Sequence, residues 1–111
     1  MAVVTLTPQD VDREGVAASY DTLNAADTYT FRNTGSTMLH FKNAGGSVAT
    51  VTLTTPGTIS DLAIQDPTVQ VAAGGERFVA MLPTSTFSDS GGKAAFTQDQ
   101  AAGVTAAVVR T

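Results

Sequence analysis

The side chain best suited to acid–base chemistry in this sequence is its one histidine, His40. It lies in the segment 37–42, where apolar and polar residues alternate, and it falls on the face opposite the apolar ones. Ser36 and Ser47 flank this segment in glycine-containing turns, but neither stands in a nucleophile elbow. A Ser-His-Asp triad is defined by the arrangement of its side chains in space, so the spacing of these residues along the sequence does not by itself exclude one. A single histidine on a strand more often faces solvent or an interface than a substrate. We therefore expect no catalytic residues and no enzymatic activity.

Carboxylates and glycines are the other groups that could do chemistry. The carboxylate pairs are Asp10 with Asp12 and Asp61 with Asp66, and the glycine pairs are Gly45–Gly46 and Gly74–Gly75. Neither carboxylate pair has the spacing of a calcium-binding EF-hand loop, so we expect them to cap turns and hydrogen-bond loops. Each glycine pair separates two predicted strands, whereas a phosphate cradle needs a helix start behind it. Because the chain also lacks cysteine, we expect neither a metal site nor a cofactor.

Composition excludes several classes of partner. The chain has 111 residues, the length of one small domain, and its six basic and ten acidic residues give a net charge of −4. An acidic chain without a basic run binds nucleic acid poorly. The two longest nearly uncharged stretches, 43–60 and 94–109, are interrupted by Thr, Gly and Gln, so no membrane-spanning helix is expected. The N-terminal residues likewise do not resemble a secretory leader.

The same composition favours a β-protein. Only 14% of the residues are charged and 18 of the 111 are Thr, which suits neither a disordered chain nor a helical bundle. From residue 28 onward the sequence alternates with a period of two, and turns rich in Gly, Asn and Pro divide it into about seven short strands. Two hairpins are expected, one joining 37–42 to 48–55 and the other joining 68–71 to 76–82.

These patterns predict one domain over residues 28–111, an all-β fold that is a small antiparallel β-sandwich or barrel. The predicted core consists of Phe31, Leu39, Phe41, Val51, Leu53, Val71, Phe78, Phe96 and Val108.

Residues 1–27 differ from the rest and are expected to form an N-terminal arm. Thr7, Pro8 and Asp10 are typical of a helix start, so the arm is predicted to contain a short helical turn. Residues 2–7 have high β propensity but lie outside the alternating pattern. An apolar strand of this kind either pairs with an edge elsewhere or folds back onto its own sheet as an extra edge strand, and both alternatives stay open.

Seven stretches of strand and turn sequence cover nearly the whole chain: Leu6–Val11 with Arg13 and Gly15, Asn33–Asn43, Val51–Thr58, Leu62–Asp66, Val69–Gly74, Pro83–Phe87 and Gly103–Arg110. In this order they resemble a family of small phage proteins known as capsid decoration, minor capsid or cement proteins. The resemblance implies a structural virion protein that binds the outer surface of an assembled capsid and stabilises it, without catalysis. It implies the major capsid protein as the partner, assembly in the host cytoplasm and a final location on the outside of the virion.

Within that family role, the N-terminal strand is the predicted contact. We expect it to pair with an edge strand of a neighbouring copy or of the major capsid protein, so that Val3, Val4, Thr5 and Leu6 are the partner-binding residues. Val4 and Leu6 would point to one face and fill a pocket on the partner. A homotrimer is the preferred state, because a capsid offers many three-fold positions. Neither nucleic acid nor a membrane is an expected partner.

The alternative function is a surface-exposed β-module that binds carbohydrate or a host surface. Sugar-binding modules usually present exposed aromatic platforms. This chain has no Trp, two Tyr and five Phe, and the alternation assigns several of these rings to the core. The sequence therefore favours the structural role.

Overall fold

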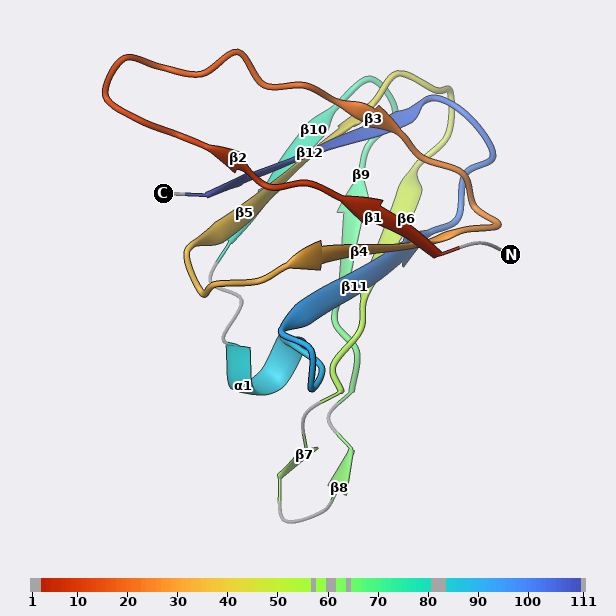
Figure 1. Ribbon diagram of the computed structural model, residues 1–111. Helices are drawn as coiled ribbons and strands as arrows, with labels where there is room; N and C mark the ends of the chain where they lie inside the picture. Colours follow the sequence, from red (N-terminus) through yellow and green to blue (C-terminus); the bar gives the residue numbers. More distant parts are fainter. Residues whose placement is uncertain (1–2, 57, 60–61, 64, 81–83, 111) are drawn as a thin grey trace.

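The chain folds into two mixed β-sheets that together form a sandwich (Figure 1). The computed structural model describes residues 3–56, 58–59, 62–63, 65–80 and 84–110. The elements are β1 (Val3–Leu6), β2 (Gln9–Asp10), β3 (Asp21–Thr22), β4 (Thr28–Arg32), β5 (Thr37–Asn43), β6 (Ala49–Leu53), β7 (Thr58–Ile59), β8 (Leu62–Ala63), β9 (Thr68–Val71), β10 (Glu76–Val79), α1 (Thr84–Phe87), β11 (Lys93–Gln98) and β12 (Val104–Arg110).

The first sheet has the strand order β1-β4-β11-β6-β9. The second sheet has the order β10-β5-β12-β2, and β3 also pairs with β12. A separate antiparallel pair, β7–β8, projects beyond the sheets in Figure 1. The predicted all-β sandwich is confirmed, but it is not antiparallel throughout, because β1 pairs with β4 and β2 pairs with β12 in parallel. The described residues form more than the seven strands expected, because the segment before residue 28 adds three and β7–β8 adds a short pair.

The core lies between the two sheets and is built around Phe96 of β11. Its ring centroid lies 5.5 Å from that of Tyr29, 6.2 Å from that of Phe31 and 5.1 Å from that of Phe41, so that aromatic rings from both sheets meet there. Eight of the nine predicted core residues are buried, which confirms the alternation as a guide to the inward face. They are Phe31, Leu39, Phe41, Val51, Leu53, Val71, Phe96 and Val108.

The prediction for the ninth residue, Phe78, is wrong: it is 60% exposed. β10 pairs with β5 so that Phe78 lies opposite His40, and paired residues share a face of the sheet. His40 faces outward, and Phe78 therefore does too, while the neighbouring Val79 packs against the core. The residues of this segment are apolar at both odd and even positions, so the sequence does not indicate which face of the strand points to the core. The predicted strand 76–82 ends at residue 79 in the structure, and residues 81–82 lie outside the described part of the chain.

Neither of the two predicted hairpins forms. β5 pairs with β10 and β12, whereas β6 pairs with β11 and β9, so the connection from β5 to β6 crosses between the sheets. β9 and β10 are divided between the sheets in the same way. Alternation specifies which side chains face the core but not which strand lies alongside, and both arrangements bury the same residues.

Asn43 fixes the crossing from β5 to β6. Its side-chain nitrogen donates to the carbonyl oxygens of Ser47 at 2.7 Å and Val71 at 3.1 Å. Its side-chain oxygen accepts a hydrogen bond from the backbone N–H of Gly45 at 2.9 Å. Because Asn43 is buried, these bonds satisfy polar groups that would otherwise be costly, and they hold the end of the first sheet against the second.

The N-terminal segment belongs to the sandwich and is not a separate arm. β1 pairs with β4 in parallel, β2 pairs with β12 in parallel and β3 pairs with β12 antiparallel. Leu6 and Leu23 are both buried in the common core. The expected boundary at residue 27 therefore corresponds to no break in the packing.

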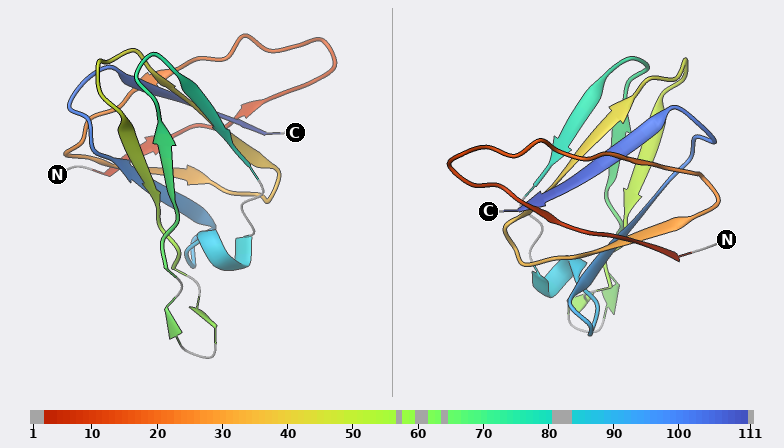
Figure 2. Two further views of the ribbon diagram at one scale, coloured as in Figure 1. Left: turned by 180° about the vertical axis from the view of Figure 1, so that it is seen from behind. Right: turned by 45° about the horizontal axis from the view of Figure 1, so that its top comes forward.

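The helical turn predicted after Pro8 is also wrong. Gln9 and Asp10 form β2, and the backbone N–H of Val11 donates to the carbonyl of Arg110 at 2.8 Å, which extends this strand pairing. The chain then forms a long loop that reaches outward beyond the sheets in both views of Figure 2. Pairing with β12 satisfies the backbone groups that a helix would have satisfied internally, and the apolar residues of the loop have no core to face.

A single helical turn, α1, lies instead in the predicted polar loop around Phe87, whose ring packs against the core. Among the described residues, no helix has the length and apolar character needed to cross a membrane.

Asp66 closes the base of the projecting β7–β8 pair. One carboxylate oxygen accepts hydrogen bonds from the hydroxyl of Thr55 at 2.6 Å and from its backbone N–H at 2.9 Å. These bonds favour the charged form, and they lower the pKa of Asp66 below its ordinary value of 3.8. The pKa of Asp99 is lowered in the same way, chiefly by the backbone N–H of Thr50.

A carboxyl group with a depressed folded pKa contributes stability above its unfolded pKa and loses it as the pH falls through the folded value. We therefore expect the wild-type protein to exceed the Asp66→Asn variant in stability by a constant margin above about pH 5, and this margin to shrink below about pH 4. Urea unfolding of both proteins at a series of pH values measures it. The comparison isolates Asp66, because Asp99 titrates equally in both. A margin that stays constant down to pH 2 would contradict the role of Asp66.

Candidate functional site

The outer face of the second sheet carries the most distinctive group of side chains in the described structure. Alternation along β5 and β10 points Lys42, His40, Glu76 and Phe78 away from the core. In register, Phe78 lies opposite His40 and Glu76 lies opposite Lys42, so the four form two neighbouring rows. Tyr20, from the end of the long N-terminal loop, packs onto the same face.

His40 is the centre of this group and is only 8% exposed. Its Nε2 lies 3.2 Å from a carboxylate oxygen of Glu76, and its Nδ1 lies 2.7 Å from the hydroxyl oxygen of Tyr20. A carboxylate can only accept, so Nε2 donates to Glu76, while Nδ1 and the tyrosine hydroxyl share the second hydrogen bond. Both ring nitrogens are thus engaged in holding the side chains of the outer face together.

Two aromatic rings and one ammonium group complete the arrangement. The rings of His40 and Phe78 are stacked, with centroids 4.0 Å apart and planes 5° from parallel. The ring of Tyr20 meets His40 edge-on, with centroids 5.5 Å apart, and the ammonium of Lys42 lies 4.3 Å from the centroid of the Tyr20 ring. Stacking and cation–π contacts both restrict these side chains, so the outer face presents an ordered surface.

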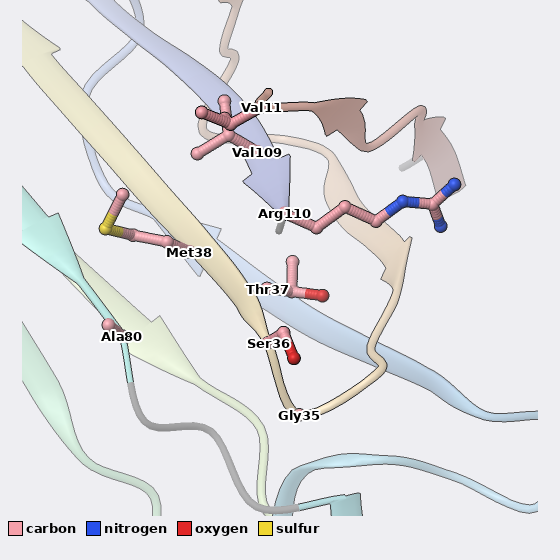
Figure 3. A pocket seen from close by; sticks show the side chains of 8 residues that line it. All are labelled: Val11, Gly35, Ser36, Thr37, Met38, Ala80, Val109 and Arg110. Carbon is pink, nitrogen blue, oxygen red and sulfur yellow. The ribbon is translucent and has the colours of Figure 1, made fainter. Parts of the chain in front are cut away.

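Two hollows border this group. One is a shallow, mainly apolar groove of about 300 Å³, shown in Figure 3. Arg110 extends away from Met38 there and pairs with Asp10, with 2.6 Å between Nε and the carboxylate oxygen. The groove is lined by Val11, Gly35, Ser36, Thr37, Met38, Ala80, Val109 and Arg110. The other hollow, of about 430 Å³, is lined by Lys42, Asn43, Ala44, Gly74, Gly75 and Glu76.

The structure does not bring the candidate catalytic residues together. The hydrogen-bond partners of the His40 side chain in the described structure are Tyr20 and Glu76, and neither Ser36 nor Ser47 is among them. Within the ranges that the structure describes, no three His, Cys, Asp or Glu side chains are grouped as metal ligands.

The carboxylates considered as ligands have structural partners. Asp10 binds Arg110, and Asp12 accepts a hydrogen bond from the backbone N–H of Glu14 at 3.0 Å. Asp66 holds the base of β7–β8, and Asp61 lies outside the described residues. The contacts of Asp12 and Asp66 agree with the expected roles in turns and loops, whereas Asp10 lies in β2 and links it to β12 through its ion pair with Arg110.

The predicted partner-binding residues form an edge of the first sheet. β1 pairs with β4 on one side, and in the described structure its other side has no neighbouring strand. Leu6 is buried and Val4 packs against the core, so these two side chains do not fill a pocket on a partner as predicted. Val3 is 70% exposed and Thr5 is also exposed, which leaves these two side chains and the free backbone edge for a partner.

Sequence reasoning missed the cluster around His40, because it placed Phe78 inside and left Tyr20 in an arm. Comparisons of the chain with protein-family models, with curated proteins and with solved structures found no match. Function is therefore inferred from the surface of the molecule and from the sequence patterns.

Proposed function

We propose that this chain is a structural protein that binds the outer surface of an assembled phage capsid and stabilises it, with no catalytic role. Its partner is the major capsid protein, and copies of the chain contact one another on the shell, most simply as homotrimers at three-fold positions. It joins the virion from the host cytoplasm once the shell has formed. The ordered resemblance along nearly the whole sequence supports this proposal, as does a sandwich small enough to bind in many copies.

The observation that carries the proposal is the free edge of β1. Sheet edges expose unpaired N–H and C=O groups, and monomeric proteins usually protect them with charged residues, proline or a bulge. β1 has no charged residue, and Val3 is more exposed than the other large apolar side chains of the described structure. An edge of this kind suits strand addition, in which the backbone supplies affinity and the outward side chains supply specificity.

Binding of this kind stabilises a capsid by linkage. A protein that binds the assembled shell and not its dissociated subunits shifts the assembly equilibrium at every occupied site. Because a shell repeats the same site many times, a modest affinity per copy adds up over the whole particle.

The direct test adds the purified protein to undecorated capsids, formed by the major capsid protein encoded with it, and images the particles by electron cryomicroscopy. Regularly spaced extra density at stoichiometric occupancy, together with a higher melting temperature of the shell, is the expected result. Bare capsids at saturating protein would refute the proposal.

A charge on the β1 edge should weaken attachment to the capsid without affecting the fold. Val3→Lys places an ammonium group on the free edge, where it opposes strand addition. Since Val3 is exposed, the melting temperature of the free protein should change by less than about 2 °C, while capsid affinity should fall at least about tenfold. Val48→Lys is the matched control, because Val48 is 48% exposed and lies before β6, at the opposite side of the first sheet from β1. Equal capsid binding by the two variants would show that β1 is not the contact.

A further inference from the structure

We propose that the outer face of the second sheet carries a binding site for a neutral sugar ring, centred on Phe78. This residue is 60% exposed, and the imidazole of His40 is stacked on one face of its ring at 4.0 Å. Because 60% of the residue remains exposed despite this stacking, much of its surface is available to a ligand. The C–H groups on the flat side of a pyranose are weakly positive and the face of an aromatic ring is negative, so the two attract each other while excluding water.

The platform is ordered before any ligand arrives. His40, behind the Phe78 ring, is nearly buried and is held from both sides by Tyr20 and Glu76. Freezing a mobile side chain on binding costs affinity, and an aromatic ring that is already supported avoids much of that cost. The His40 network therefore gives Phe78 the rigidity that a weak, single-ring ligand requires.

Polar groups suited to sugar hydroxyls lie beside the ring. Glu76 and Lys42 form the row next to Phe78 and His40, and both line the hollow of about 430 Å³. The Glu76 side chain is 56% exposed, so its carboxylate can accept hydrogen bonds from two adjacent hydroxyls, and the Lys42 ammonium can donate to a third. Gly74 and Gly75 contribute no side chains, which keeps the hollow open.

The charges of this site favour a neutral ligand. Glu76 and Lys42 are the charged residues that line the hollow, and their charges cancel. A neutral hexopyranose offers hydroxyl groups to both side chains and brings no net charge to a site whose own charges cancel. The site is also compatible with attachment through β1, because Phe78 lies on the outer face of the second sheet and β1 lies at an edge of the first.

The test is a titration of the ¹⁵N-labelled protein, followed by NMR, with the methyl glycosides of glucose, galactose, mannose and N-acetylglucosamine. At least one of them should produce saturable shifts in the backbone amides of residues 74–79. Phe78→Ala should then weaken binding at least about tenfold, and Phe78→Tyr should retain it. If no glycoside gives saturable shifts, or if the shifts map to another face, the proposal is wrong.

Two further variants separate recognition from loss of structure. Glu76→Gln keeps an acceptor for His40 but removes the charge, so it should weaken sugar binding while the melting temperature stays near that of the wild type. Val48→Ala removes an exposed apolar side chain outside the site and should bind the same glycoside unchanged. Wild-type affinity in both Phe78→Ala and Glu76→Gln would overturn the proposal, and neither result depends on whether the protein binds capsids.

Discussion

Replacing Phe96 with alanine is expected to lower the free energy of unfolding by about 3–5 kcal/mol. Phe96 is fully buried in β11 and contacts the rings of Tyr29, Phe31 and Phe41, so its removal leaves a cavity at the meeting point of both sheets. Native domains have only about 5–15 kcal/mol of stability in total, so the variant should lose a large share of it. Chemical denaturation followed by circular dichroism measures the change.

Phe78→Ala is the matched control for this experiment. The sequence assigns both phenylalanines to the core, whereas the structure buries one and exposes the other. Removing the exposed ring costs mainly its stacking on His40, so we expect a loss of about 1 kcal/mol or less. Similar losses for the two variants would mean that β10 has the other register, with Phe78 inside.

Removing residues 2–7 should lower the melting temperature of the isolated protein by about 10 °C or more. The truncation deletes the buried Leu6 and the four residue pairs between β1 and β4, and it exposes the edge of β4. If residues 2–7 were instead an arm outside the domain, which is the alternative that the sequence suggests, removing them would change the melting temperature of the isolated protein little.

Single substitutions test the same point without removing backbone. Leu6→Ala should reproduce a large part of the destabilisation, about 2–5 kcal/mol, because its side chain lies in the core. Val3→Ala should be nearly neutral, because Val3 is on the opposite, exposed side of β1. A truncated protein that melts like the wild type, together with a harmless Leu6→Ala, would show that β1 does not belong to its own sheet.

The sequence is informative about which residues are buried wherever one parity of a strand is clearly apolar. Phe31, Leu39, Phe41 and Val51 are of this kind, and each is buried as predicted. Phe78 lies in a segment that is apolar at both parities, where the choice depends on the register with β5. Which face of β10 points to the core is therefore decided by its pairing with β5, and the sequence of the segment itself does not reveal it.

The candidate site was less predictable than the core, since it depends on pairing between distant segments. The cluster around His40 needs Tyr20 from the N-terminal loop and Glu76 from β10, which lie 20 residues before it and 36 residues after it. The crossings between sheets were missed for a related reason. A glycine-rich turn permits both a hairpin and a crossing, and the buried hydrogen bonds of Asn43 that stabilise the crossing from β5 to β6 include one to Val71, which is distant in sequence.

The placement of β11 and β12 has a consequence for how the protein is made. Both strands are central in their sheets, yet both are synthesised after all the other strands described. Each sheet therefore lacks an interior strand until the ribosome has translated these last two described strands. Since almost every strand pairing joins distant segments, loop closure must precede most of the stabilising contacts, and folding should take milliseconds to seconds rather than microseconds. The nascent chain therefore exposes unpaired, apolar strands until β11 and β12 are available to pair with them, and such exposure favours aggregation.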